Sequence, residues 1–332
     1  MTETLWVIGG EQRLSFLQQA EWNSFQTAVV VRVRDDQLER VLEYESPPER
    51  CPDDQSSHLF KAATIDGGTA WLCTQTEVLE CDFPSFSIRR VISLPCFNDL
   101  HHVTPGPDGT LFVTVTGLDA VAEVSRDGEL IRLVNVLGED PWARFSPTVD
   151  YRKVPTTKPH HSHPNYVFFL AGRPWVTRFE QRDAVPLDGL SQNGYKPFQI
   201  GFQGNHDGHV HGNRLHFTTV DGHLVTFDLA TGEKTDLDLN RIEAAEPDDD
   251  RPLGWCRGLL PLGDQAWIGF TRLRHTKLRQ NLSWVRHGFR SSPYHRRRPS
   301  RIALYDLERR VKLREIDVEG AGLNAVFSIH QG

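Results

Sequence analysis

The stretch His101–Gly138 decides the fold, and it reads HHVTPGPDGTLFVTVTGLDAVAEVSRDGELIRLVNVLG. Four short runs in it, HHVTP, LFVTVT, AVAEV and LIRLVNV, alternate apolar and polar residues as half-buried strands do. The turns at Pro107-Asp108-Gly109 and Arg126-Asp127-Gly128 contain Asp-Gly pairs, which supply the positive φ that tight hairpins require. Four antiparallel strands in so short a stretch predict one blade of a β-propeller.

The same frame recurs in four other places along the chain, around Gly68, Gly172, Gly212 and Gly263. Alignment of the expected second strands brings one bulky residue of each repeat into a single column, namely Trp71, Phe112, Trp175, His216 and Trp267. The sequence therefore predicts five blades between about residues 58 and 318.

The two ends of the chain complement each other. The segment LNAVFSI (323–329) has the character of an inner strand with nothing after it, whereas LWVIGG, AVVVRVRD and LERVLEYES near the start are three strands without an inner partner. Pairing the two ends removes both open sheet edges. We therefore predict an all-β chain with a single domain over residues 1–332, a six-bladed β-propeller closed by pairing of its N- and C-terminal strands. A β-sandwich explains neither the repeated frame nor the complementary ends, and five or seven blades remain open alternatives.

Composition is that of an ordinary globular protein, with 38% hydrophobic and 24% charged residues and a formal net charge of −7. The negative charge makes nucleic acid an unlikely partner. No apolar run approaches the ~20 residues that cross a bilayer, so we expect no membrane association. The start MTETLWVIGGEQ lacks a signal-peptide pattern, and five cysteines without CxxC spacing favour a reducing compartment. We expect a cytoplasmic protein.

Residues 100–138 resemble the six-bladed propellers of the NHL-repeat and gluconolactonase-like superfamily, whose hallmark is a Pro-Asp-Gly turn before an aromatic-rich strand. The resemblance is weaker over 58–83 and 205–235. It bears on the fold more than on activity, because one fold hosts many chemistries.

The chain contains 15 histidines, and several fall where inner strands begin, at one mouth of the expected axis. Three successive blades bring His101-His102, His163 and His206 to this register, and His161, His209 and His211 lie close by in the sequence. Converging neutral imidazoles predict a site for a divalent transition metal ion such as zinc, iron or copper.

Other polar residues also fall where the inner strands are expected to begin. Lys61 and Arg257 begin blades on either side of the histidines, so we predict a catalytic role for both in holding an anionic substrate group. Asn165, Asn205 and Asn324 are predicted substrate-binding residues and leave calcium as a less favoured cofactor. Each of these groups has an ordinary alternative: histidines and asparagines can fill a wet channel, and each cation can pair with a nearby acid.

The histidine arrangement resembles that of peptidyl-hydroxyglycine amidating lyases, in which three blades each give one histidine to a zinc ion. The family's histidine eight residues before the Asp-Gly glycine falls on His101, whereas His163 and His206 lie near the corresponding starts at different offsets. Carotenoid oxygenases, with four axial histidines around iron, are a second resemblance, but they have seven blades. Both imply an axial metalloenzyme, and neither transfers a substrate.

A basic insertion at about 272–301 contains Trp284, Phe289 and Tyr294 among many Arg and Lys residues. We interpret it as a lid or interface, with a plain loop or a nucleic-acid contact as alternatives. Glu180 and Asp183 are weaker acid–base candidates, and Glu243–Arg251 is expected to be an exposed acidic loop.

These observations predict a metal-dependent enzyme that acts on a small molecule, and the two cations allow this molecule to be anionic. The chemistry would be that of a lyase or hydrolase with zinc, or of an oxygenase with iron or copper. The alternative is a non-catalytic propeller that binds a protein partner or serves as a scaffold.

Overall fold

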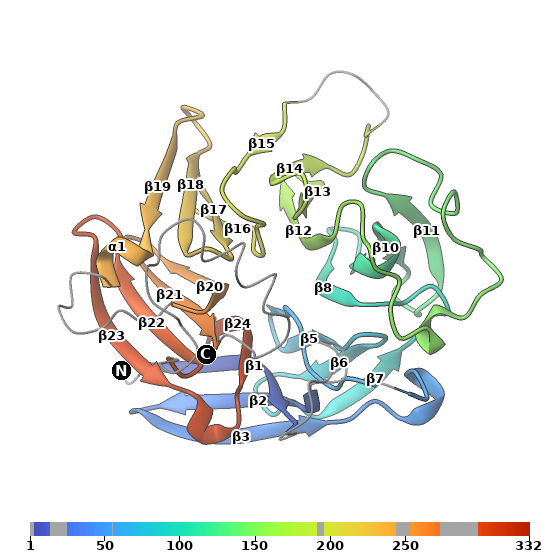
Figure 1. The fold of residues 1–332 in the computed structure, drawn as a ribbon, viewed down its shortest axis with the longest axis horizontal. Helices are drawn as coiled ribbons and strands as arrows, with labels where there is room; N and C mark the ends of the chain where they lie inside the picture. Colours follow the sequence, from blue (N-terminus) through green and yellow to red (C-terminus); the bar gives the residue numbers. More distant parts are fainter. Residues whose placement is uncertain (1–2, 14–24, 55, 191–195, 244–252, 273–297) are drawn as a thin grey trace.

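The computed structural model describes residues 3–13, 25–54, 56–190, 196–243, 253–272 and 298–332. Six four-stranded antiparallel sheets stand around a central axis, which is the six-bladed β-propeller predicted from the sequence (Figure 1). We number the blades along the chain, starting with the one that contains both chain ends.

Blade 1 combines β24 (Ala325–Gln331) with β1 (Thr4–Gln12), β2 (Phe25–Arg34) and β3 (Gln37–Tyr44). Blades 2 and 3 comprise β4 (Thr64–Asp66), β5 (Thr69–Cys73), β6 (Val78–Asp82) and β7 (Ile88–Ile92), then β8 (Leu100–Pro105), β9 (Leu111–Val115), β10 (Ala120–Val124) and β11 (Leu130–Asn135). Blades 4 and 5 comprise β12 (Pro164–Leu170), β13 (Arg173–Arg178), β14 (Asp183–Pro186) and β15 (Phe198–Gln199), then β16 (His209–His211), β17 (Arg214–Thr219), β18 (His223–Asp228) and β19 (Lys234–Asp238). Blade 6 comprises β20 (Trp255–Leu262), β21 (Gln265–Thr271), β22 (Arg301–Asp306) and β23 (Val311–Asp317).

The ring closes through blade 1, as predicted. β24 pairs antiparallel with β1, with Val7 opposite Ile329, and β1 continues the sheet to β2. The two chain ends accordingly lie close together in Figure 1. Blade 1 thus has its inner strand from one end of the chain and its other three strands from the opposite end.

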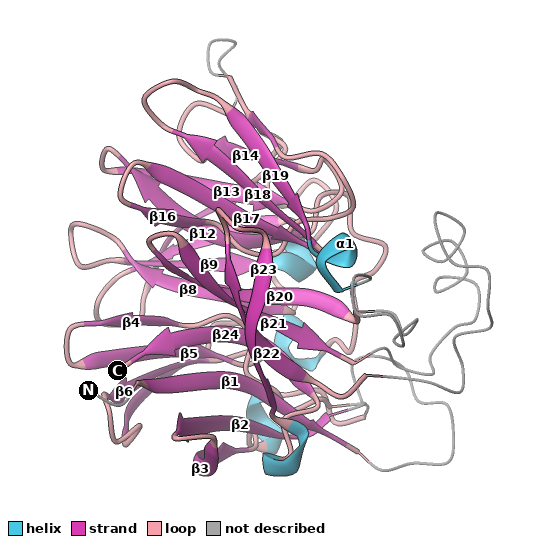
Figure 2. Cartoon of the chain, turned by 90° about the vertical axis from the view of Figure 1, so that its left-hand side faces the viewer, coloured by secondary structure: helices cyan, strands magenta, loops and turns pink. Residues whose placement is uncertain are grey.

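The hydrophobic core lies between blades. Strands of neighbouring blades stack side by side, and the short helix α1 (Leu239–Glu243) lies on one face (Figure 2). Each junction buries a cluster drawn from both blades; for example, Val7 and Val29 of blade 1 pack with Trp267 and Ile302 of blade 6. The expected aromatic column lies on the second strands: Trp71 on β5, Phe112 on β9, Trp175 on β13, His216 on β17 and Trp267 on β21.

Two sequence predictions lie largely outside the described residues: the basic insertion at about 272–301, of which 273–297 are not described, and the acidic loop Glu243–Arg251, of which 244–251 are not. Within the described ranges, no helix has the length and apolar character needed to cross a membrane.

Candidate functional site

Each blade sends one side chain to a ring around the axis. Five of the six come from the blade starts that the sequence marked, and blade 1 presents Phe327 in place of the expected Asn324. Five of these side chains are buried, and His163 is partly exposed. In blade order the ring is Phe327, Lys61, His101, His163, His206 and Arg257.

Contacts run around this ring. The centre of the His101 ring lies 4.9 Å from that of His163 and 5.9 Å from that of His206. On the other side of His101, the Lys61 Nζ lies 3.4 Å from Nε2 of the imidazole. The three histidines that the sequence selected from successive blades are therefore side by side.

A β-bulge separates the two histidines of the doublet. The pairing of β8 with β9 shifts between Leu100 and Val103, so that His101 and His102 both face the single residue Thr114. The Thr114 hydroxyl oxygen accepts the backbone N–H groups of both His101 and His102, at 3.2 and 2.7 Å. Bulges commonly redirect side chains beside functional sites. Here the bulge sends His101 to the ring.

His163 is held by a buried carboxylate. Its backbone has φ of 58°, in the left-handed region that histidine adopts only occasionally. Asp119, which is 1% exposed, accepts the backbone N–H groups of His161, Ser162 and His163 at 2.8–2.9 Å. The carboxylate therefore fixes the turn from which the His163 imidazole projects.

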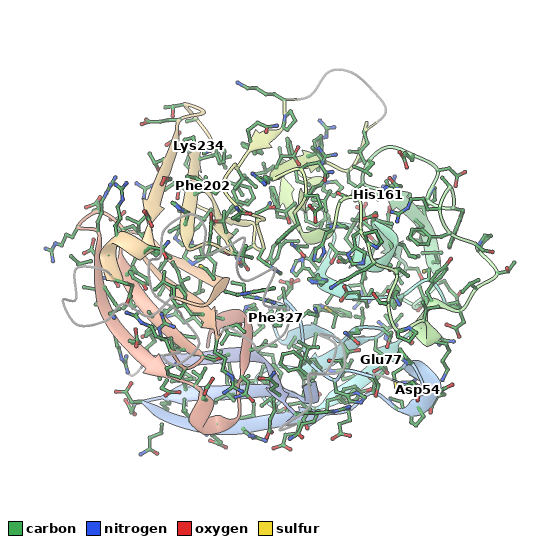
Figure 3. All side chains as sticks on the ribbon, viewed as in Figure 1. Asp54, Glu77, His161, Phe202, Lys234 and Phe327 are labelled. Carbon is green, nitrogen blue, oxygen red and sulfur yellow. The ribbon has the colours of Figure 1, made fainter. Side chains whose placement is uncertain are left out.

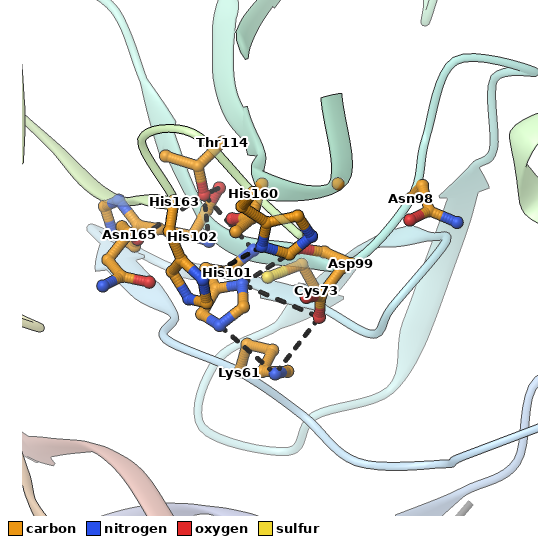
Figure 4. A network of polar contacts seen from close by, with 12 residues as sticks. Lys61, Cys73, Asn98, Asp99, His101, His102, Thr114, His160, His163 and Asn165 are labelled. Carbon is orange, nitrogen blue, oxygen red and sulfur yellow. Dashed lines mark hydrogen bonds and ion pairs between the residues drawn. The ribbon is translucent and has the colours of Figure 1, made fainter. Parts of the chain in front are cut away.

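Asp99 links Lys61 to His101 (Figure 4). Its carboxylate lies 3.5 Å from the Lys61 Nζ, and its backbone carbonyl accepts the Nδ1–H of His101 at 2.9 Å. This hydrogen bond leaves the lone pair of His101 on Nε2, toward Lys61. Burial by itself would raise the pKa of Asp99, but the positive charge of the nearby Lys61 lowers it well below its usual range.

The pKa of each of the three ring histidines is lowered, which favours the neutral imidazole near pH 7. Burial, reinforced by the positive charge of Lys61, lowers the pKa of His101 well below its usual value. Burial lowers the pKa of His163 to about 3, and burial together with Arg257 lowers that of His206 well below normal. Neutral imidazoles keep a lone pair available for a metal ion or a proton.

Lys61 and Arg257 share one aromatic neighbour. The Lys61 Nζ lies 4.9 Å and the Arg257 Cζ 4.4 Å from the centre of the Phe327 ring, which Figure 3 shows near the middle of the molecule. Cations held against an aromatic face in a desolvated place are stabilised by the ring's electrons. The ring thus has an imidazole half, from blades 3 to 5, and a cationic half centred on Phe327.

Two of the predicted ligands lie together in a separate group. The His102 ring stacks on Tyr166 with centres 3.6 Å apart, and the His209 ring lies 5.0 Å from the same tyrosine. His102 also accepts the backbone N–H of Val167 on Nδ1 at 3.2 Å, so this nitrogen already has a partner.

The remaining predicted histidines lie away from the ring. His161 is exposed (Figure 3), and only its backbone contacts Asp119. His211 is exposed and accepts the backbone N–H of Gly263 at 3.1 Å.

The predicted amides have different surroundings. Asn165 and Asn205 are 1% and 0% exposed, and the Asn165 Nδ2 donates to the Asn205 carbonyl at 2.8 Å. Asn324 instead accepts the backbone N–H of Gln12 at the junction of β24 and β1. Of the two acid–base candidates, Glu180 is exposed and Asp183 forms a bidentate ion pair with Arg178.

Three residues close to the ring were not predicted from the sequence: Asp99, Asp119 and Phe179. Asp119 lies more than forty residues from the loop that it holds, so no local pattern connects the two. Asp99 had a local signal, because it lies two residues before His101 and a carboxylate often orients an imidazole.

The three imidazoles and the distances between their ring centres agree in part with a three-histidine metal site. Three imidazoles around one tetrahedral zinc ion have ring centres about 5 Å apart, given Zn–N distances of about 2.0–2.1 Å. However, within the described ranges no group of three or more His, Cys, Asp or Glu side chains is arranged to hold a metal ion. Because the Lys61 Nζ lies against Nε2 of His101, metal binding would require this lysine to move aside.

A cleft of about 810 Å³ lies apart from this ring, between blades 5 and 6. The Phe202 ring stacks on His223 within it, with centres 3.9 Å apart, and His223 pairs with Asp236 at 3.3 Å. The His223 imidazole has an acidic partner, and His223 is the one histidine among the described residues that line the cleft. The axial ring is therefore the stronger candidate site.

The sequence matches no protein-family model and no curated protein. Among solved structures, a protein of unknown function from Bacteroides caccae is similar over 100% of this chain and 99% of its own, with a TM-score of 0.58 at 12% identity. A chain of a nidogen/laminin complex is similar over 100% of this chain and 98% of its own, with a TM-score of 0.57 at 9% identity. Virginiamycin B lyase from Staphylococcus aureus matches 81% of this chain and 84% of its own, with a TM-score of 0.44 at 15% identity. At these identities the similarities concern the fold alone.

Proposed function

We propose that this chain is a metal-dependent enzyme that acts on a small anionic molecule at the propeller axis. The observation that carries the proposal is the convergence of His101, His163 and His206, one from each of three successive blades. The centre of the His101 ring lies 4.9 Å from that of His163 and 5.9 Å from that of His206. A scaffold that binds proteins through its loops has no need of neutral, mostly buried imidazoles at one point of its axis.

In this proposal the three histidines would hold zinc, iron or copper, and the cationic half of the ring would receive the substrate. The ion would act as a Lewis acid toward a substrate oxygen or water. Lys61 and Arg257 supply positive charge for a carboxylate or similar group, and Arg257 can bind it with two parallel hydrogen bonds. Asp99 holds the His101 ring through its backbone carbonyl and keeps the Lys61 ammonium beside the site.

The proposal also concerns the enzyme family to which the activity is related and the cellular compartment of the protein. The histidine arrangement supports an activity related to that of the amidating lyases within the NHL-like propellers. All five cysteines are free and buried, which supports a reducing compartment and hence the cytoplasm.

Metal analysis of tag-free protein tests the proposal. We expect about one zinc, iron or copper ion per chain by plasma mass spectrometry, and its loss in the variant His206→Ala. The control is His161→Ala, which removes an exposed imidazole from the loop that carries His163 and should keep the metal. A wild-type protein that contains none of these metals and takes up no added zinc would contradict the proposal and favour a non-catalytic binding propeller.

A further inference from the structure

Phe179 places a partly exposed aromatic ring beside the histidines. It follows β13 in blade 4, and its ring centre lies 5.1 Å from that of His163 and 6.1 Å from that of His206. The Phe179 backbone N–H donates to the His163 carbonyl at 3.2 Å. The ring position is therefore tied to the backbone of the site.

Gly204 makes room for this ring. A Cβ atom at Gly204 would lie 2.2–2.3 Å from three atoms of the Phe179 ring, so the ring or the backbone would have to move to accommodate it. The segment before β16 that carries His206 thus passes directly beneath the aromatic ring. The His206 ring also lies 6.3 Å from the Phe327 ring, so this imidazole has two phenyl rings near it.

The two cations and Phe179 contact different residues of the same site. Lys61 and Arg257 contact Phe327, whereas Phe179 lies beside His163 and His206. Small-molecule sites commonly combine apolar walls with a few polar groups that fix orientation. A partly exposed phenyl ring gains from contact with an apolar group, because water leaves both surfaces.

We propose that the axial site selects small carboxylates with an apolar body, the carboxylate lying at Lys61 and Arg257 and the apolar body against Phe179. This inference depends on the proposed axial centre as the binding place. It depends on neither turnover nor the identity of a metal.

Three probes separate the two parts of the inference: acetate carries only the charge, 2-phenylethanol only the aryl group, and phenylacetate both. We expect calorimetric titration of the full chain to give phenylacetate an affinity about tenfold or more above that of each other probe. Equal affinities for acetate and phenylacetate would overturn the apolar part. Equal affinities for 2-phenylethanol and phenylacetate would overturn the anionic part.

Variants at Phe179 test the residue itself. Phe179→Ala should reduce the preference for phenylacetate over acetate to about twofold, and Phe179→Leu should keep most of it, since leucine retains apolar bulk. Phe202→Ala, which removes a partly exposed ring in the distant cleft, should leave the preference unchanged. An unchanged preference in Phe179→Ala would refute the assignment, and if that variant does not fold, Phe179→Gln provides the same comparison.

Titrations on metal-free and zinc-loaded protein keep this inference apart from the proposed function. Selective phenylacetate binding by a protein that never takes up metal would support the carboxylate site and overturn the metal dependence of the proposed function. Metal binding without selectivity for phenylacetate would support the proposed metal centre and overturn the carboxylate site.

Discussion

Gly204 is the residue where the smallest change should have a large effect. The variant Gly204→Ala places a methyl group against the Phe179 ring, and overpacking of this kind costs about 1–3 kcal/mol of unfolding free energy. We expect urea unfolding to show this loss, together with weaker binding at the axis because the segment before β16 that carries His206 must shift.

Gly68 provides the matched control for this substitution. It lies in the turn between β4 and β5, and a Cβ there meets nothing within 4 Å. Gly68→Ala should therefore leave stability unchanged or slightly higher, because alanine restricts the unfolded chain. A Gly204→Ala protein as stable as Gly68→Ala would show that the Phe179 ring does not rest on this backbone.

At the scale of elements, the loop before β12 depends on Asp119 more than on its own sequence. Burial alone would raise the pKa of Asp119, but the N–H groups of His163, His161 and Ser162 lower it below its usual value. Arg144 also donates to this carboxylate at 2.7 Å. The loop conformation thus relies on one negative charge from blade 3.

The variant Asp119→Asn tests that charge without disturbing the backbone. Asp119 has φ of 52°, which asparagine also adopts readily, so the substitution changes mainly the side-chain acceptor. We expect a loss of roughly 2–4 kcal/mol, since hydrogen bonds to an ionised group are replaced by weaker or unmatched ones. Hydrogen exchange at the amides of His161, Ser162 and His163 should accelerate, and unchanged protection there would contradict this account.

Most strands could be predicted from the local sequence, whereas the candidate site could be predicted only in part. Apolar alternation and Asp-Gly turns are local signals, which is why the strands of blade 3 agree with the predicted runs almost residue by residue. In blade 1 the register differs: the pairing shifts between Ile8 and Gly9, and Phe327 rather than Asn324 reaches the axis. Contacts such as Asp119 with the loop at His163, or Gly204 with Phe179, join distant segments and leave no periodic trace.

For the whole molecule, buried neutral histidines predict sensitivity to acid. Burial lowers the pKa of His330 to about 3 and that of His216 to about 4, while an unfolded histidine titrates near ~6.5. Between these values the unfolded chain binds more protons than the folded one, so acid favours unfolding. Each histidine then removes about 1.4 kcal/mol of stability per pH unit below ~6.5 until its folded pKa is reached.

Urea unfolding at a series of pH values from 7.5 to 4.5 measures this slope. We expect the free energy of unfolding to stay nearly level above pH ~6.5 and to fall steadily below it. His330→Gln should make the fall shallower, because one proton-binding group of the unfolded chain is gone. An equal slope in the variant would show that His330 does not contribute.

Ring closure through blade 1 also sets an order of events during synthesis. β1, β2 and β3 leave the ribosome first, but β24, their inner partner, comes after all five other blades. At ~5–20 residues added per second, the nascent blade 1 waits on the order of half a minute with one strand edge unpaired. Chaperones that shield exposed strand edges should therefore matter most to this protein while it is still attached to the ribosome.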